Sequence, residues 1–200
     1  VVGDEKLENF SVNANIINDF TESLYLRGGI AVKKGESIRN LDAGFTDFDL
    51  RTITPFLSSI FNDIRGKASG RATILGTHKN PKIAGRLHLN DAGMKPVFTN
   101  VDYAFEENAI LDITESQFIL NNVRITDSKY LTEGTINGVI THNKLKNWRL
   151  DTQLSSSNLL ALDIDYIEGT PYYGQAFIDG SAKVSVPVEA LNVSIEATSM

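Results

Sequence analysis

Hydrophobic and polar residues alternate along most of this chain. In three well-separated segments, residues 83–89, 97–105 and 191–197, mostly apolar residues occupy every second position and mostly polar residues lie between them. Because successive side chains of a β-strand point to opposite faces, each segment predicts a strand with one apolar and one polar face. The pattern recurs about a dozen times with little helical periodicity between the repeats. It predicts an all-β protein whose sheet has an apolar side that must be covered.

The strand candidates follow one another with short turns between them. We expect strands over residues 10–18, 24–34, 44–50, 67–76, 82–90, 97–105, 109–113, 117–121, 122–126, 133–141, 146–154, 159–164, 172–178, 181–186 and 191–197. From Leu50 to Ile64, apolar residues instead recur three or four positions apart, and Thr54-Pro55 fits an N-cap with a first-turn proline. A short amphipathic helix is therefore predicted over residues 54–63. Its polar side lacks Lys and Arg, so we expect it to cover an end or edge of the sheet.

The composition is that of an ordinary globular protein. The chain has 200 residues, of which 42% are hydrophobic and 22% charged, and a net charge of −6. An acidic chain without a basic stripe argues against nucleic-acid binding and against electrostatic docking on anionic lipid. The absence of cysteine excludes disulfides, zinc–thiolate sites and thiol catalysis. No apolar run has the length of a membrane-spanning helix. Since the chain begins at Val1 without a signal-like stretch, we interpret residues 1–200 as one all-β segment excised from a larger envelope protein.

Residues with catalytic or metal-binding chemistry are scattered. The three histidines are not accompanied by carboxylates at ligand spacing, which argues against a metal site. The pairs Asp47/Asp49 and Asp163/Asp165 each fall on one strand face, and we interpret them as solvent-facing charge because acid–base catalysis needs a shielded pocket. The run 155–157 is three serines without the G-x-S-x-G context of a nucleophile. We therefore expect no enzyme activity, no catalytic residue, no cofactor and no metal.

Glycine-spaced motifs and a weak internal repeat indicate a family. Residues 70–89 and 180–195 both read as strand, turn and strand, with a proline in each turn. The motifs are Gly66-Lys-Ala-Ser-Gly70 with Asn80-Pro81-Lys-Ile83-Ala-Gly85-Arg-Leu87, Gly134-Thr-Ile-Asn-Gly138-Val-Ile-Thr-His142 with Trp148-Arg-Leu-Asp151, and Tyr172-Tyr173-Gly174-Gln-Ala176-Phe-Ile-Asp-Gly180. In their order and spacing these segments resemble the C-terminal region of the TamB family of AsmA-like envelope proteins.

The resemblance implies a fold and a location. TamB-family proteins are anchored in the inner membrane and reach across the periplasm toward an outer-membrane partner of the Omp85 class. Their long, meandering and largely antiparallel sheet curls into a U-shaped β-taco trough with an apolar interior. They are implicated in phospholipid transport between the membranes, in outer-membrane homeostasis and in the assembly of outer-membrane proteins. No catalytic residue belongs to the family pattern, and this segment carries no anchor.

We therefore expect a periplasmic, non-enzymatic trough that shields phospholipid acyl chains, or strands of outer-membrane proteins, from water. Each CH₂ moved from water to an apolar surface gains about 0.8 kcal/mol, so a greasy groove removes a barrier on the order of 10 kcal/mol for a whole tail. The residues predicted to line the groove are Ile74, Ile83, Leu87, Val101, Tyr103, Phe105, Ile136, Ile140, Trp148, Leu150, Ile178, Val184, Val193 and Ile195.

One alternative fold stays open at this point. Periodicity alone favours a closed β-sandwich, which would act as an adhesion or carbohydrate-binding module, and only the family resemblance reverses that preference. In either fold, a strand at an exposed sheet edge is expected to pair with a neighbouring chain in a crystal.

Overall fold

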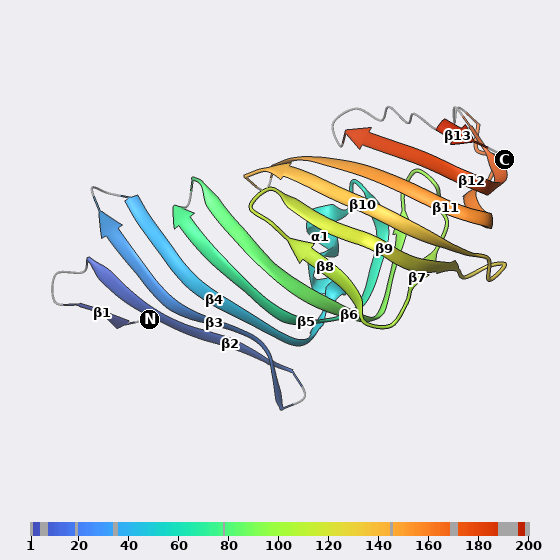
Figure 1. Ribbon diagram of the computed structural model, residues 1–200. Helices are drawn as coiled ribbons and strands as arrows, with labels where there is room; N and C mark the ends of the chain where they lie inside the picture. The colour runs from blue at the N-terminus through green and yellow to red at the C-terminus, as the bar shows by residue number, and fades with distance from the viewer. Residues whose placement is uncertain are drawn as a thin grey trace.

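The computed structural model describes residues 2–4, 8–18, 20–33, 36–77, 79–144, 146–168, 172–187 and 196–198, and it confirms the all-β fold. The strands are β1 (Val2–Gly3), β2 (Asn9–Asn18), β3 (Thr21–Lys33), β4 (Glu36–Asp49), β5 (Phe61–Thr77), β6 (Pro81–Pro96), β7 (Tyr103–Phe105), β8 (Ala109–Ile113), β9 (Gln117–Asp127), β10 (Glu133–Asn143), β11 (Lys146–Ile164), β12 (Gly174–Pro187) and β13 (Glu196–Thr198). They join one 13-stranded antiparallel sheet in which each strand pairs with the next along the chain, except that β8 lies beside β7 and pairs with β6 and β9 (Figure 1).

The pairing register carries the apolar side chains of the strands onto one face. Directly opposed residues on neighbouring strands project to the same side of a sheet. One row of opposed residues crosses the sheet from β2 to β12: Ile16, Leu24, Phe45, Gly70, Leu87, Leu111, Leu120, Gly138, Thr152 and Val184. Because adjacent rows on this face are also mostly apolar, the sheet has one continuous apolar face.

The two halves of the sheet differ in how well this face is covered. In Figure 1, strands β1–β4 extend to one side, whereas β9–β12 arch over the region of β5 and β6. The main buried cluster lies in the arched half and contains Tyr103, Ile125, Leu159 and Leu160, each less than 3% exposed. The apolar face of β2–β4 lies outside this cluster, apart from Phe45, which packs against it. The main buried cluster therefore lies in the arched half, and on β2–β4 the buried apolar side chains are Val12, Leu41 and Ala43.

Hydrogen bonds between distant segments hold the arched half closed at one end. The Tyr103 hydroxyl donates to the Leu160 carbonyl at 2.8 Å, and the backbone N–H of Asp163 donates to the Thr99 carbonyl at 2.9 Å. The Tyr172 hydroxyl also donates to a carbonyl of the same loop, that of Phe98, at 3.1 Å. These contacts connect β7 and the loop before it to β11 and to the segment before β12, so the sheet cannot flatten at this end without losing them.

The predicted helix over residues 54–63 begins earlier and is shorter in the structure. A 3-10 turn, η1 (Leu50–Ile53), leads into a single α-helical turn, α1 (Thr54–Leu57), and β5 begins at Phe61. Apolar side chains of both turns pack against the buried cluster. The helical segment therefore covers the core at one edge of the sheet.

A β-bulge explains why the helical period continues beyond the helix in the sequence. The pairing of β5 with β6 shifts register at two places near the start of β5. The first shift, between Phe61 and Asp63, adds a residue to β5, whereas the second, between Arg65 and Lys67, adds one to β6. The buried residues Phe61 and Ile64 therefore lie three positions apart while the backbone is extended, and Ala68 follows Ile64 by the even spacing of an ordinary strand. The spacing of these residues resembles that of a helix for this reason.

The strand predicted over residues 97–105 is also shorter than expected. Residues 97–102 form a loop, and only Tyr103–Phe105 is a strand. The loop turns because the backbone N–H of Asn100 donates to the Pro96 carbonyl at 3.0 Å and Asn100 adopts a positive φ of 57°, a conformation that Asn tolerates better than most residues. The alternation in the loop reflects burial of Val101 and not strand geometry.

The turn between β9 and β10 is organised by a buried carboxylate. Asp127 is fully buried and accepts hydrogen bonds from the backbone N–H groups of Lys129, Tyr130 and Thr132 at 3.0, 2.7 and 2.7 Å, and from the Thr132 hydroxyl. Burial by itself raises the pKa of Asp127, but these four hydrogen bonds outweigh it and leave the pKa below its ordinary value. The turn presents Tyr130 and Leu131 outward, where both are exposed.

Two glycines of the apolar row allow a matched test of the backbone. Gly70 has a φ of +154°, and a Cβ there would lie 2.2 Å from the Arg86 carbonyl oxygen, whereas the nearest atom to a Cβ at Gly138 is 3.7 Å away. We expect Gly70→Ala to lower the free energy of unfolding by about 1–3 kcal/mol and Gly138→Ala to raise it by about 0.5–1 kcal/mol. Urea denaturation measures both; equal stability of the two variants would contradict the assigned backbone.

The Asp127 turn predicts a specific acid sensitivity. Since the pKa of Asp127 is lowered in the folded state, its contribution to stability is complete above the unfolded value of about 3.9 and is lost as the pH falls through the folded value. Asp127→Asn should cost about 1.5–3 kcal/mol at pH 7 and less at pH 2.5. Urea midpoints at both pH values measure the difference, and a cost that does not depend on pH would argue against a charged Asp127.

Candidate functional site: an apolar groove

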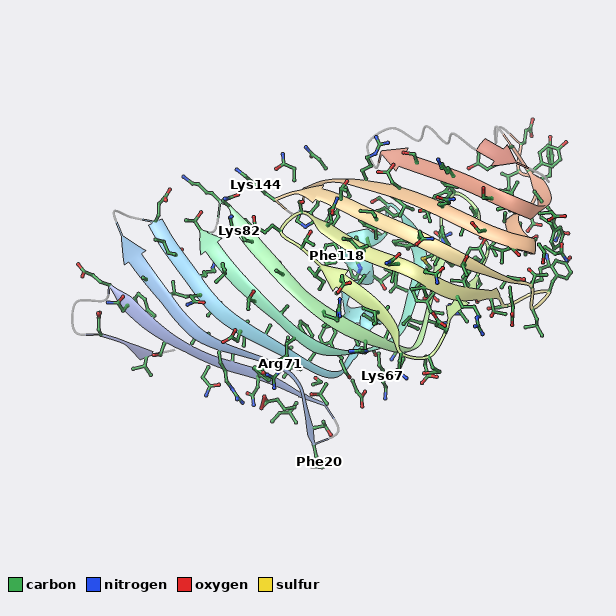
Figure 2. The ribbon with its side chains drawn as sticks, viewed as in Figure 1. Phe20, Lys67, Arg71, Lys82, Phe118 and Lys144 are labelled. Carbon is green, nitrogen blue, oxygen red and sulfur yellow. The ribbon has the colours of Figure 1, made fainter. Side chains whose placement is uncertain are left out.

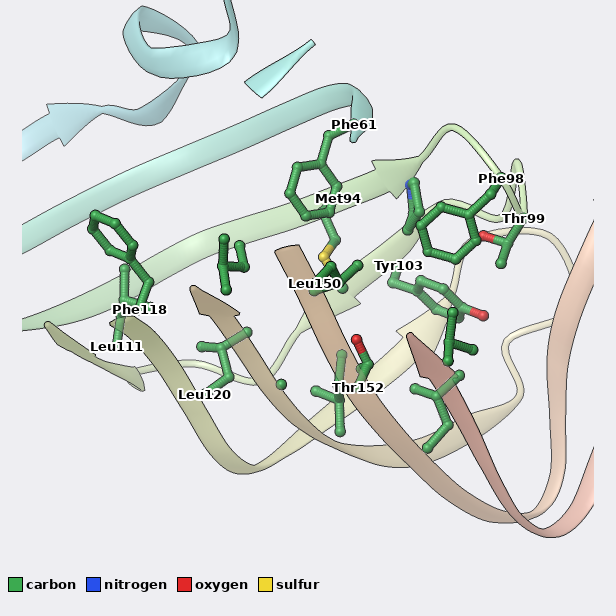
Figure 3. Close-up of a pocket in the computed structure, with 16 residues that line it drawn as sticks. Phe61, Met94, Phe98, Thr99, Tyr103, Leu111, Phe118, Leu120, Leu150 and Thr152 are labelled. Atoms are coloured by element: carbon green, nitrogen blue, oxygen red, sulfur yellow. The ribbon is translucent and has the colours of Figure 1, made fainter. Parts of the chain in front are cut away.

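The arched half of the sheet encloses a groove that is lined almost entirely by apolar side chains (Figure 3). Its lining residues are Phe61, Met94, Pro96, Phe98, Thr99, Tyr103, Leu111, Phe118, Leu120, Ile136, Gly138, Ile140, Leu150, Thr152, Leu154 and Val184. The cavity between them has a volume of about 70 Å³ and opens to solvent. None of these side chains carries a charge.

Alternating positions on consecutive strands build the groove. Ile136, Gly138 and Ile140 follow one another at every second position of β10, and Leu150 and Thr152 do the same on β11. Strands β5 and β6 contribute through their ends, which lie beside the helical segment and the loop before β7. Strands distant in the order of the sheet therefore line one space, which requires the sheet to curl.

The two ends of the groove have different character. In Figure 3, Phe98, Thr99 and Tyr103 lie at one end and Phe118 at the other. The Tyr103 hydroxyl is bound to the Leu160 carbonyl, and burial, reinforced by the nearby Asp127 carboxylate, raises the pKa of Tyr103 far above its ordinary value. Tyr103 is thus a neutral group at physiological pH and closes its end without adding charge.

An aromatic cluster of Phe118, His142 and Trp148 lies at the Phe118 end of the groove. The His142 ring lies 5.6 Å from the Phe118 ring and 5.0 Å from the Trp148 ring, and Phe118 and Trp148 are 6.0 Å apart. Burial lowers the pKa of His142, so the imidazole is neutral near pH 7. The groove is accordingly uncharged along its whole length.

The groove offers very little polar chemistry. Apart from the hydroxyl of Tyr103, its side-chain polar atoms are the hydroxyls of Thr99 and Thr152, and the Thr152 hydroxyl is buried with no hydrogen-bond partner among the described residues. Within the described part of the chain, no three or more His, Asp or Glu side chains are grouped so that they could hold a metal ion. The arrangement favours a guest that is neutral and apolar.

The apolar face of the sheet extends beyond the groove onto β2–β4, where Leu41 and Ala43 are buried. Phe10, Leu24, Leu26 and Ile30 are only half-buried there, and Val12 is 9% exposed. The shared register joins this face to the groove, as the row from Ile16 to Val184 shows. The groove and the apolar side chains of β2–β4 therefore belong to the same face of the sheet.

The structure distributes the residues predicted to line the groove over three environments. Those that line it are Tyr103, Ile136, Ile140, Leu150 and Val184. Those that pack within or against the buried cluster instead are Ile83, Leu87, Val101, Phe105, Trp148 and Ile178. Ile74 is half-buried and pairs with Leu41 and Ile83 on the same face, outside the groove. Val193 and Ile195 lie outside the described residues.

Several lining residues were missed for identifiable reasons. Leu111, Phe118 and Leu120 alternate within predicted strands and could have been found by extending the strand pairing. Phe61 lies in the segment mistaken for helix, and Phe98 falls on the polar side of the strand wrongly predicted over residues 97–105. Contact across the groove between β6 and β11 has no local sequence signal.

The aromatic cluster predicts a stability change at mildly acidic pH. Because the pKa of His142 is lowered in the folded state, its contribution is present above the unfolded value of about 6.5 and is lost as the pH falls through the folded value. We expect the urea midpoint of the wild type to fall between pH 7.5 and pH 5 and His142→Phe, which keeps the ring packing, to lose part of this dependence. Identical pH profiles would exclude His142 as the source.

No known protein family, curated protein sequence or solved structure matches this chain. Among the described residues, no helix has the length and hydrophobicity needed to span a membrane.

Proposed function

We propose that this protein is a non-enzymatic shield for apolar chains and that its groove accommodates phospholipid acyl chains. The observation that carries the proposal is the continuous apolar face, which enters a solvent-connected groove without a charged lining residue. Such a surface binds an apolar guest because binding removes apolar area of both partners from water. It offers no directional contact for a polar substrate.

The dimensions favour an extended guest that is only partly enclosed. An apolar cavity of about 150 Å³ holds a benzene molecule, so the enclosed 70 Å³ of this groove is too small for a whole acyl chain. A tail would therefore place one part in the groove and the remainder along the half-buried face of β2–β4. At about 0.8 kcal/mol for each buried CH₂, even partial coverage is a substantial gain.

The resemblance to the TamB family supplies the proposed context. A TamB-like protein would work in the periplasm, with its parent chain anchored in the inner membrane and an Omp85-class partner in the outer membrane. The cargo would be phospholipid moving between the membranes, and the same surface would suit strands of an outer-membrane protein during assembly. The uncharged groove agrees best with the lipid cargo.

The alternative function loses its structural basis. An adhesion or carbohydrate-binding sandwich requires two facing sheets, whereas the described strands join a single sheet. The main buried cluster of this protein covers the apolar face of the arched half of the sheet, whereas a sandwich would cover the apolar face of both halves.

A substitution at Gly138 tests the proposal directly. Gly138 lines the groove, and its surroundings leave room for a Cβ, with Thr152 and Ile136 as the nearest neighbours at 3.7 and 3.8 Å. Gly138→Leu should fill the groove and weaken binding of a fluorescent fatty acid at least tenfold, while Gly138→Ala should stay within about threefold of the wild type. Fluorescence titration gives the affinities, and circular dichroism with urea denaturation checks the fold.

Two results would overturn the proposal. One is a folded wild-type protein that does not bind the fatty acid. The other is equal affinity of the wild type and a folded Gly138→Leu variant, which would put the binding site elsewhere.

A further inference from the structure

The exposed large hydrophobic side chains gather at one edge of the sheet. Because neighbouring strands are antiparallel, the turns lie alternately at the two ends of the strands. The turns β2–β3, β9–β10 and β11–β12 lie at the same end, which we call this edge of the sheet. Exposed apolar residues at or near this edge are Ile17, Phe20, Tyr130, Leu131, Tyr166, Ile167 and Tyr173. Lys82 and Lys144 lie at the opposite edge, and Figure 2 shows both of them at the ends of the strands away from Phe20. The distribution is uneven, and isolated exposed hydrophobics would not produce it.

Part of this edge carries six exposed apolar residues that we call the aromatic strip and define as Tyr130, Leu131, Tyr166, Ile167, Tyr173 and Phe177. Their exposed fractions range from 46% for Phe177 to 72% for Leu131. The Tyr166 and Tyr173 rings lie 4.9 Å apart, and the Tyr130 and Phe177 rings lie 5.6 Å apart. Gln175, which lies between Tyr173 and Phe177 along the chain, accepts a hydrogen bond from the Tyr130 hydroxyl at 3.2 Å and so joins the Tyr130 turn to β12.

Polar contacts hold the strip in its exposed position. The buried Asp127 fixes the turn that carries Tyr130 and Leu131. The Lys129 ammonium binds the Asp163 carboxylate at 2.8 Å, and the Gln175 amide donates to the same carboxylate at 2.7 Å. The turn after β9 is thus joined through Asp163 of β11 to Gln175 of β12.

The charge around the strip favours one type of surface. The Lys129 ammonium is already paired with Asp163, and the neighbouring turn adds the exposed carboxylates of Asp165 and Glu168. With a net charge of −6, the protein is repelled by an anionic surface. Exposed aromatic rings beside carboxylates suit a surface that presents ammonium groups above an apolar layer, which describes a bilayer with choline or ethanolamine headgroups.

We propose that the aromatic strip docks this protein on the surface of a zwitterionic phospholipid bilayer. Tyrosine is suited to this position because its ring is apolar and its hydroxyl is polar, so it lies at headgroup level. Leu131 and Ile167 at the turns enter the apolar layer beneath. A sugar-stacking platform fits less well, because the Tyr166 and Tyr173 rings are at 83° to each other and present no shared flat surface. This inference does not depend on the groove.

Vesicle flotation tests the proposal with a matched pair of variants. The strip variant combines Tyr130→Ser, Tyr166→Ser, Tyr173→Ser and Phe177→Ser. The control combines Ile38→Ser, Leu75→Ser and Ile110→Ser, which remove side chains that are 39–42% exposed elsewhere on the sheet. With phosphatidylcholine vesicles, we expect the strip variant to lose at least tenfold in partition coefficient and the control to stay within about twofold of the wild type. Vesicles of phosphatidylglycerol should bind the wild type more weakly than phosphatidylcholine.

If the strip variant does not fold, a measurement on the wild type still tests the proposal. Phosphatidylcholine brominated near the headgroup should quench the tyrosine fluorescence of the wild type. The proposal is overturned by any of four results: no flotation of the wild type, equal flotation of folded strip and control variants, preference for phosphatidylglycerol, or absence of quenching. Strip-dependent dimerisation in sedimentation velocity without flotation would likewise identify a second copy as the occupant.

The Gly138→Leu variant distinguishes binding by the groove from binding by the strip. If both proposals hold, this variant floats with phosphatidylcholine as the wild type does but loses fatty-acid binding, and the strip variant does the reverse. Loss of flotation in Gly138→Leu would attribute vesicle binding to the groove and contradict docking through the strip.

Discussion

The structure depends on one constraint, which is that the strands pair in a register that keeps their apolar residues on a common face. A shift by one residue in a single pairing would move that strand's side chains to the other face. The register persists from Ile16 on β2 to Val184 on β12 through nine successive pairings in one row. The irregular pairings at the start of β5 and within β11 adjust the strands locally without breaking this row. The core, the groove and the open face are parts of the same apolar face of the sheet, and they differ in how much of it other side chains cover.

The curl of the sheet decides how much of that surface is covered. Small residues in the row, such as Gly70 and Gly138, leave space where the strands approach one another. The arched half is then held by the hydrogen bond of Tyr103 in β7 to Leu160 and by that of Asp163 to Thr99 in the loop before β7. Among the described residues, no hydrogen bond of this kind crosses the face of β2–β4, where Phe10, Leu24, Leu26 and Ile30 stay half-buried. The uneven coverage is the reason that the protein has both a packed core and a place for an apolar guest.

The sequence was informative where structure is local. Alternation predicted the strands and the polarity of their faces, because period two is a property of the single strand. It failed at Phe61 and Ile64, where a bulge produced a helical spacing, and at Asn100, where a turn interrupts the alternation. The groove was predicted only in part: Ile136, Ile140 and Leu150 follow from alternation, whereas Phe61 and Met94 face them through a curl that no local pattern encodes. The aromatic strip has the same origin, since its turns are separated in sequence and meet through strand pairing.

The most direct test of the central claim locates a bound acyl chain on the sheet. In a methyl NMR spectrum, a fatty acid spin-labelled along its chain should broaden the signals of Ile136, Ile140, Leu150 and Val184 and should spare Ile38, Leu75 and Ile110, which are exposed elsewhere on the sheet. That pattern would place the guest in the groove, as the account requires. Equal broadening of both sets, or broadening of the second set alone, would show that the fatty acid does not bind selectively in the groove and would contradict the account.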